Sequence, residues 1–283
     1  MSVVSSIREV LTAKGLAHIA EHMEAIAMPS LLFASGTHSE EACTRIGGRP
    51  NLPEAITWPT WRDSALPFIA QLDLMAMPHI GGLDLPSRGS LYFFYEGGQE
   101  AWGFRPEDRG SAQVIYSLDS LQEHPLRALP KEIPDEMRFR GVRLDPEVVD
   151  LSVPDLEDQV LEPLHLSVEE RDRHLKFLQD WGAGKPFTSH RVGGYPEPLQ
   201  GDPKLEAQLV FHDLYCGDPS GFRRGKELGL WPGATDWQLL LQVDSDEKVE
   251  MMWGDVGRLY FLLRKQDLAL CQFERTWLIF QCL

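Results

Sequence analysis

The chain has 283 residues, of which 43% are hydrophobic and 10% aromatic, enough to bury a full core. Acidic residues outnumber lysine and arginine 43 to 27, and the net charge of -16 argues against nucleic acid and anionic membrane surfaces as partners. No apolar run approaches the roughly 18 residues needed to cross a bilayer, and the first residues lack the order of a secretory signal, so we expect a cytoplasmic protein.

Four cysteines are scattered along the chain without any Cys-x-x-Cys pair, namely Cys43, Cys216, Cys271 and Cys282. A structural zinc site would need two close pairs. We therefore expect free thiols in a reducing compartment, no metal and no cofactor.

Residues 5–27 have the pattern of two short helices separated by a C-cap at Gly15. The string His18-Ile-Ala-Glu21-His22 matches the H-x-x-E-H motif of inverted zinc peptidases. On the helical wheel, however, these three side chains point away from the apolar stripe. We interpret them as a solvated polar face, because a catalytic zinc needs a third ligand and a buried surrounding shell.

The next part of the chain alternates strands with turn-rich loops. Residues 45–59 contain three prolines after Gly47-Gly48, which predicts an ordered irregular loop with glycine in a positive-φ conformation. Strands are predicted at 31–34, 66–74, 91–95 and 112–118, with further sheet at 102–104. Strict alternation along 66–74 would put Ile69, Gln71 and Asp73 on one face.

The remainder of the chain begins with an acidic, proline-rich segment at 119–166, where valines and leucines favour short strands and a subdomain boundary is expected. Helices are predicted from the capping box at Ser167 to about Trp181, at 204–216 and briefly at 266–272. Strands are predicted at 237–244, 258–263 and 273–282, and strict alternation puts Trp237, Leu239, Leu241 and Val243 on one apolar face.

An internal repeat organises this pattern. Each half runs Gly-Gly-x-Pro, then Gln-x-Asp at the end of an apolar strand, then Gly-x-Leu-Tyr-Phe. The matched positions are Gly47 with Gly193, Pro50 with Pro196, Gln71 with Gln242, Asp73 with Asp244, and Gly89 with Gly257. We therefore predict an α+β fold of mostly antiparallel sheets with flanking helices. Two diverged repeats, at about 30–118 and 185–283, would be related by a pseudo-two-fold axis and form one compact unit over residues 1–283.

If the halves face each other, the two Gln-x-Asp pairs and the two Gly-Gly loops would meet in a cleft. Nearby polar residues complete the candidate ligand-binding set, which is Gln71, Asp73, His190, Tyr195, Gln200, Gln242, Asp244, Asp255 and Arg258. The alternative is structural, because buried Gln and Asp side chains are also suited to tie down the backbone of each Gly-Gly-x-Pro turn.

The chain resembles the YwqG-like family of bacterial proteins, a family of unknown function. The motifs that carry the resemblance are Gly47-Gly-x-Pro50-x-Leu-Pro53 with Trp58-Pro59, Phe68-Ile-Ala-Gln-Leu-Asp73, His190 through Gly193-Gly-Tyr-Pro to Gln200-Gly-Asp202-Pro, Leu240-Leu-Gln-Val-Asp244-Ser-Asp246, Met252-Trp-Gly-Asp255 and Gly257-Arg-Leu-Tyr-Phe261. The resemblance implies a single α+β unit from the bacterial cytoplasm. It implies no activity and therefore no catalytic residues.

Two functions follow as hypotheses. The first is a non-enzymatic binding or interaction protein that holds a small ligand or partner protein between its halves, with aromatic residues in turn-rich loops. The second is a carboxylate-based or metal-assisted hydrolase that uses Asp73, Asp244 and Asp255. No Gly-x-Ser-x-Gly or other recognised nucleophile motif occurs, which favours the first.

Overall fold

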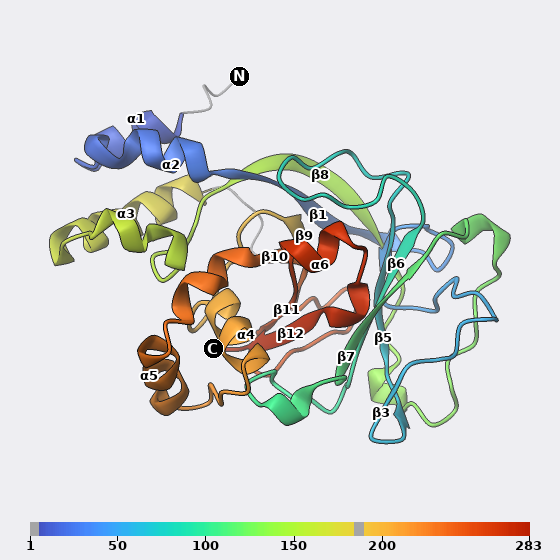
Figure 1. The fold of residues 1–283 in the computed structure, drawn as a ribbon. Coiled ribbons are helices and arrows are strands. Elements are labelled where there is room, and N and C mark those ends of the chain that lie inside the picture. Colours follow the sequence, from blue (N-terminus) through green and yellow to red (C-terminus); the bar gives the residue numbers. More distant parts are fainter. Residues whose placement is uncertain (1–5, 184–189) are drawn as a thin grey trace.

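A computed structural model describes residues 6–183 and 190–283, which form an α+β fold with one large antiparallel sheet and helices on its flanks (Figure 1). Residues 185–189, the start of the predicted second half, lie outside the described residues. Among the described residues, no helix has the length and apolar character needed to cross a membrane.

The large sheet has ten strands, and the two strands that pair at its middle, β1 and β8, are its longest. In sheet order the strands are β12 (Trp277–Gln281), β11 (Arg258–Arg264), β10 (Trp237–Asp244), β9 (His190–Gly193), β1 (Met28–His38), β8 (Val142–Ser152), β2 (Arg45–Ile46), β5 (Phe68–Asp73), β6 (Ser90–Tyr95) and β7 (Ala112–Ser117). A separate hairpin pairs β3 (Thr60–Trp61) with β4 (Ser64–Ala65).

Six α-helices and seven 3-10 helices lie among the described residues. The α-helices are α1 (Ile7–Ala13), α2 (Ala20–Ile26), α3 (Val168–Trp181), α4 (Pro203–Phe211), α5 (Pro219–Glu227) and α6 (Lys265–Ala269). The 3-10 helices are η1 (Ala17–Ile19), η2 (Pro106–Asp108), η3 (Leu121–Glu123), η4 (Asp135–Met137), η5 (Gln159–Leu164), η6 (Trp231–Asp236) and η7 (Phe273–Arg275). Capping boxes at Ser6 and Ser167 fix the starts of α1 and α3, as the sequence predicts for Ser167.

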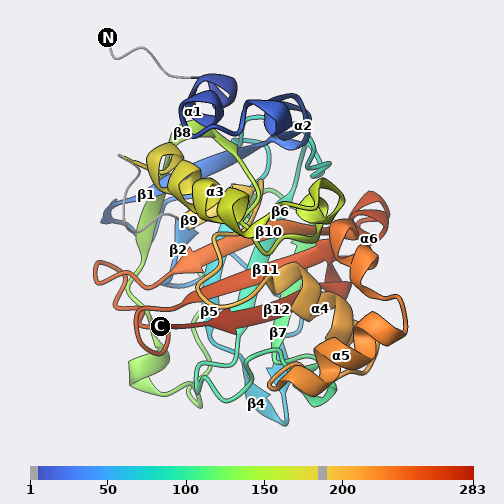
Figure 2. The same cartoon turned by 90° about the vertical axis from the view of Figure 1, so that its left-hand side faces the viewer.

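The sheet curls so that β10–β12 pack face to face on β5–β7, and Figure 2 shows the two sets of strands crossing at a steep angle. The space between them is filled by an apolar central core. Phe93 of β6 and Phe261 of β11 meet there, with ring centroids 5.1 Å apart. Trp253 packs against Tyr95 and Phe139 in the same core. The seam between the two sets of strands is therefore apolar.

Two β-bulges break the alternation that the sequence predicts. One interrupts the pairing of β5 with β6 between Phe68 and Ala70, so Ile69 packs in the central core while Gln71 lies beside Tyr92 on the outer face. The other interrupts β10 between Leu239 and Leu241. The predicted common face of Ile69 with Gln71 is wrong for this reason, as is that of Leu239 with Leu241, which pack on opposite sides of the sheet.

Three further predictions need correction. The segment 45–59, predicted as an irregular loop, begins with a short strand, β2, inside the large sheet, and the second Gly-Gly segment likewise begins with a short strand, β9. Residues 102–104 form no strand. The Trp102 carbonyl instead accepts a hydrogen bond from the Phe280 amide of β12. The acidic segment 119–166 holds one long strand, β8, which pairs with β1 and β2.

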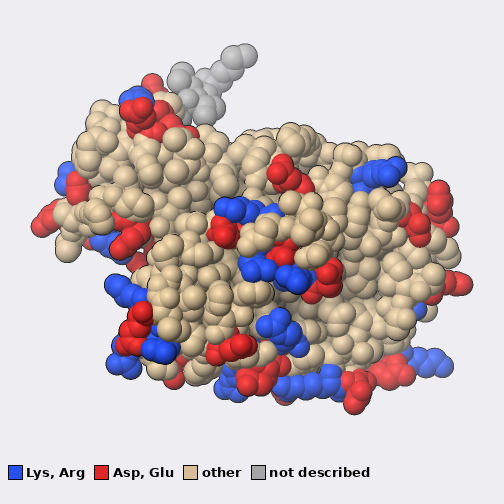
Figure 3. Space-filling view, in the orientation of Figure 1, with Lys and Arg blue, Asp and Glu red and all other residues tan. Residues whose placement is uncertain are grey.

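Charged side chains of both signs are interspersed on the face of the molecule seen in Figure 3. Acidic and basic groups lie next to one another along its lower edge. On this face the excess negative charge is thus spread out and does not form one acidic patch.

Candidate functional site

The two Gly-Gly turns have the backbone conformation that the sequence predicts. The φ angles are +67° and +71° at Gly47 and Gly48, and +72° and +68° at Gly193 and Gly194. A Cβ atom at Gly47 would overlap the carbonyl oxygen of Arg140, and one at Gly194 would lie 2.7 Å from Cβ of Ser152. Glycine is required at both turns by conformation and by close approach of neighbouring chain.

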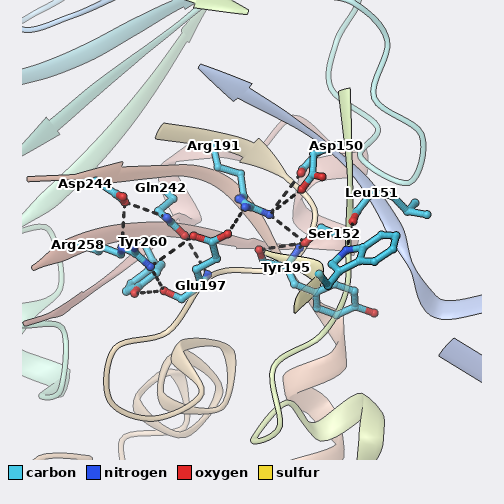
Figure 4. Close-up of polar contacts among 12 residues, drawn as sticks. Asp150, Leu151, Ser152, Arg191, Tyr195, Glu197, Gln242, Asp244, Arg258 and Tyr260 are labelled. Carbon is cyan, nitrogen blue, oxygen red and sulfur yellow. Dashed lines mark hydrogen bonds and ion pairs between the residues drawn. The ribbon is translucent and has the colours of Figure 1, made fainter. Parts of the chain in front are cut away.

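One polar network forms around the second turn, on β9, β10 and β11 (Figure 4). Gln242 Oε1 accepts a hydrogen bond from the Glu197 amide at 3.0 Å, and Gln242 Nε2 donates to Asp244 Oδ1 at 2.9 Å. Arg258 pairs with the same Asp244 oxygen at 3.2 Å and donates to the Glu197 carbonyl at 2.8 Å. Tyr260 Oη donates to that carbonyl at 2.7 Å. The network holds the backbone of the turn at Glu197.

Arg191 extends this network towards β8 and is only 1% exposed. Its guanidinium pairs with Glu197, lies 3.9 Å from Asp150 Oδ2 and donates to Ser152 Oγ at 3.1 Å. The Ser152 hydroxyl in turn accepts from the Tyr195 amide at 3.0 Å. The charge of a buried arginine is thus compensated by two carboxylates, which is what burial of a cation requires.

A matching network forms around the first turn. Gln71 Oε1 accepts from the Asn51 amide at 2.9 Å, and Tyr92 Oη donates to the Asn51 carbonyl at 2.8 Å. Gln71 Nε2 donates to the Cys43 carbonyl at 2.8 Å, and Arg45 donates to Asn51 Oδ1 at 3.0 Å. Its other acceptors are the carbonyl oxygens of Ala42 and Arg49, and burial lowers the pKa of Arg45 to about 10.

The predicted polar cleft between the halves is wrong. Gln71 is paired in register with Tyr92, and Gln242 with Tyr260. These residues lie on the outer faces of their strands, whereas the neighbouring Phe93 and Phe261 point into the central core. The sheet buries its apolar faces against each other, so each Gln faces its own turn.

Three other predicted residues lie apart from these networks. Asp73 is half-buried and accepts the Met75 amide at 3.1 Å, which makes it the cap of a tight turn. Asp255 is exposed, and its carbonyl accepts the Leu283 amide. Gln200 is exposed beside a pocket described below. Among the described residues, no group of three His, Cys, Asp or Glu is placed to hold a metal ion.

His190 lies in a small cluster with Ser35 and Asp246. Its Nε2 is 3.3 Å from Ser35 Oγ and 3.2 Å from Asp246 Oδ2, while its Nδ1 accepts the Asp244 amide at 3.3 Å. Burial alone would raise the pKa of Asp246, but hydrogen bonds from His190 and Ser35 lower it to about 2. A nucleophilic triad needs serine and carboxylate on opposite imidazole nitrogens. Here both contact the same nitrogen, and Ser35 also donates to the carboxylate, so the geometry is that of a structural cluster.

The largest of the pockets described here has a volume of about 660 Å³. It lies between the loop that follows β6 and the segment from the end of the second Gly-Gly turn to α5. Its lining residues are Glu100, Trp102, Phe104, Arg105, Asp108, Gln200, Gly201, Glu206, Tyr215, Cys216, Gly217 and Phe222. The first five belong to the predicted first half of the chain and the rest to the second, so the pocket lies between the halves even though the Gln-x-Asp pairs do not.

The sequence interpretation missed Arg45, Arg191, Glu197 and Glu206. Arg45 and Arg191 stand at the same position of the repeated motif, and this match was the available signal for a shared buried role. Glu197 follows Pro196 as Asn51 follows Pro50, which is a weaker signal. Glu206 lies inside a helix, and nothing in the sequence distinguishes it from a surface carboxylate.

Substituting Asp244 and Asp73 by asparagine should have unequal effects. Asp244 is 4% exposed and pairs with Arg258, so Asp244→Asn should lower the free energy of unfolding by about 2 kcal/mol. Asp73→Asn should change it by less than about 0.5 kcal/mol, because asparagine keeps the oxygen that caps the turn. Urea denaturation of both variants is the measurement, and equal losses would contradict this account of the two residues.

Comparison with known proteins gives one family. A search of the curated proteins finds none that matches the chain. A family model described as "Domain of unknown function (DUF1963)" matches residues 44–282, which include the network around the second turn and the whole lining of the 660 Å³ pocket. The chain therefore belongs to the DUF1963 family of domains of unknown function.

Proposed function

We propose that the protein is a non-enzymatic binding protein that holds a small ligand in the pocket between its two halves. The observation that carries this proposal is the pocket of about 660 Å³ with walls from both parts of the chain. Small-molecule sites are typically concave, of roughly 300 to 1,000 Å³, and lined by aromatic side chains with a few polar groups. Trp102, Phe104 and Phe222 supply such walls here.

The hydrolase alternative has less support. Its three carboxylates have different surroundings: Asp73 caps a turn, Asp244 pairs with an arginine, and Asp255 is exposed. A pair of carboxylates that acts as acid and base must both reach the reacting groups of one substrate. The contacts of these residues are instead those that hold backbone and neighbouring side chains.

We further infer that the two halves arose by duplication and are related by a pseudo-two-fold axis. The two Gly-Gly turns support this, because Gln71, Arg45 and Tyr92 contact Asn51 as Gln242, Arg191 and Tyr260 contact Glu197. The sheet order supports it as well: strand by strand, β1-β9-β10-β11-β12 corresponds to β8-β2-β5-β6-β7. The bulges in β5 and β10 also precede the matched glutamines by the same spacing.

The origin and location of the protein stay proposals. Bacterial origin and membership of the YwqG-like group are supported by the motifs quoted above. Cytoplasmic location is supported by the four cysteines, none of which forms a disulfide.

A screen for ligands tests the proposal. The full chain, labelled with 5-fluorotryptophan, is titrated with a library of small metabolites and followed by fluorine NMR at the Trp102 resonance, assigned with Trp102→Phe. We expect some compounds to shift this resonance and to bind about tenfold more weakly to Tyr215→Ala, because Tyr215 forms part of the pocket wall.

The matched control is Leu270→Ala, which removes a side chain that is 68% exposed and lies outside the pocket lining. It should leave binding unchanged. Failure of every compound to shift the Trp102 resonance would contradict the proposal. Consumption of a bound compound during incubation would instead favour the hydrolase.

A further inference from the structure

The pocket that we propose as the ligand site combines aromatic walls with a carboxyl group that has no cationic partner. Trp102, Phe104, Tyr215 and Phe222 all line it. The faces of aromatic rings carry negative potential and attract cations within about 6 Å of the ring centre. One cation of the protein already uses this property, because the Arg105 guanidinium lies 5.5 Å from the centre of the Tyr215 ring.

Glu206 of α4 is the buried carboxyl of the pocket and is only 5% exposed. Its Oε2 accepts a hydrogen bond from Gln281 Nε2 at 2.9 Å. Within residues 6–183 and 190–283, no group donates to its Oε1 and no lysine or arginine pairs with it. A buried carboxylate that has no cationic partner is unfavourable. The Glu206 side chain therefore tends to take up a proton and become neutral.

Burial and a neighbouring carboxyl group both favour the protonated form of Glu206. Burial raises the pKa of Glu206 to about 8, the hydrogen bond from Gln281 opposes this rise, and the neighbouring Asp202 adds to it. Burial and the nearby Asp158 raise the pKa of Asp202 itself to about 7, and the Lys204 ammonium group opposes this rise. At neutral pH the Glu206 carboxyl group is therefore mostly protonated, and a cation bound beside it would favour loss of the proton.

The other titratable groups of the pocket are Glu100, Asp108, Arg105, Tyr215 and Cys216. Asp108 is committed to the protein backbone, because its Oδ2 accepts the amides of Gly103 and Arg105. Arg105 is exposed, which places it towards the outside, whereas Glu206 is buried. Burial raises the pKa of the Cys216 thiol to about 12, so this group is neutral.

We propose that the pocket binds an organic cation, a protonated or quaternary amine whose ammonium group lies against the Glu206 carboxylate and the aromatic walls. This inference rests on the proposed function, because it names the ligand class of the same pocket. The ion pair forms only when Glu206 loses its proton, so binding near neutral pH releases a proton. Affinity should accordingly rise with pH up to about 8.

Isothermal titration of the full chain with three matched probes tests the ligand class. The probes are benzylammonium, benzyl alcohol and benzoate, which share one ring and differ in charge. We expect benzylammonium to bind at least about tenfold more tightly than the other two. Its binding heat near pH 7 should depend on the ionisation enthalpy of the buffer, because a proton is released.

Glu206→Gln and Glu107→Gln are the matched variants. Glu206→Gln keeps the shape of the side chain and should lower benzylammonium affinity by about tenfold and abolish the buffer dependence. Glu107 is exposed and outside the pocket lining, so Glu107→Gln should leave both unchanged. The comparison of the three probes on the unmodified chain does not depend on how well either variant folds.

Two outcomes overturn the inference and are distinguishable from each other. In the first, benzyl alcohol or benzoate binds more tightly than benzylammonium, and Tyr215→Ala still weakens the binding. This would exclude an organic cation as the ligand class but keep the pocket as a ligand site. Absence of binding by all three probes, together with a metabolite screen that leaves Trp102 unaffected, would overturn the proposed function as well.

Discussion

Replacing Lys204 by methionine should lower the free energy of unfolding by about 3 to 5 kcal/mol, as expected for a broken buried ion pair. Lys204 Nζ lies 2.7 Å from Asp158 Oδ2, and both side chains are 5% exposed. Without the ammonium group, Asp158 would be left as a buried charge next to Asp202. The Oδ2 atom of Asp202 already has no hydrogen-bond partner among the described residues. Urea denaturation of the variant measures the loss.

Two variants control this prediction. Lys265 pairs with Asp236 at the surface and is 61% exposed, so Lys265→Met should cost less than about 0.5 kcal/mol. Adding Asp158→Leu to Lys204→Met should recover most of the stability, because the double variant has neither the ammonium group nor the carboxylate and so buries no unpaired charge. A loss for Lys204→Met no larger than for Lys265→Met would show that the buried pair does not have the role assigned to it.

Gly103→Ala should destabilise the protein by about 3 kcal/mol or more, through strain and overlap together. Gly103 has a φ of +80°, and a Cβ atom there would overlap the carbonyl oxygen of Leu278 in β12. Its amide donates to Asp108 at 3.0 Å and its carbonyl accepts from Trp277 Nε1 at 2.9 Å. A backbone shift that relieved the overlap would therefore break contacts that hold the 100–108 loop against β12.

Gly82→Ala separates strain from overlap. Gly82 has nearly the same φ, +81°, but a Cβ atom there would have no neighbour within 4 Å. We expect it to cost only about 1 kcal/mol, the conformational part of the effect. Thermal unfolding of both variants is the measurement. Equal shifts in melting temperature would mean that close packing between the loop and β12 contributes nothing.

Much of the architecture could be predicted from the sequence, because it depends on local pattern. The capping box at Ser167 marked the start of α3, and the Gly-Gly pairs marked turns with positive φ. The pattern failed at the two bulges. One inserted residue moves the side chains of all preceding strand residues to the opposite face of the sheet. Nothing in the apolar runs of β5 and β10 distinguishes a bulged residue from a regular one.

The candidate site was harder to predict, for a physical reason. Gln242 and Asp244 were predicted from the repeated Gln-x-Asp pair and Tyr195 and Arg258 as polar residues nearby, and the structure joins them in one network. Their partners, however, are their own turn and neighbours. The pocket depends on residues such as Trp102 and Glu206, which come together only through the packing of the 100–108 loop beside α4, and a linear sequence carries no sign of that contact.

The position of β9 next to β1 has a consequence for how the chain folds. Ser30 pairs with Gly193 and Phe33 with His190, residues that lie more than half the chain length apart. Closing so long a loop costs entropy before the strand pairing can repay it, which slows folding. During synthesis the N-terminal half cannot complete its sheet until β9 has left the ribosome. We therefore expect the nascent chain to depend on chaperones until β9 has emerged and paired with β1.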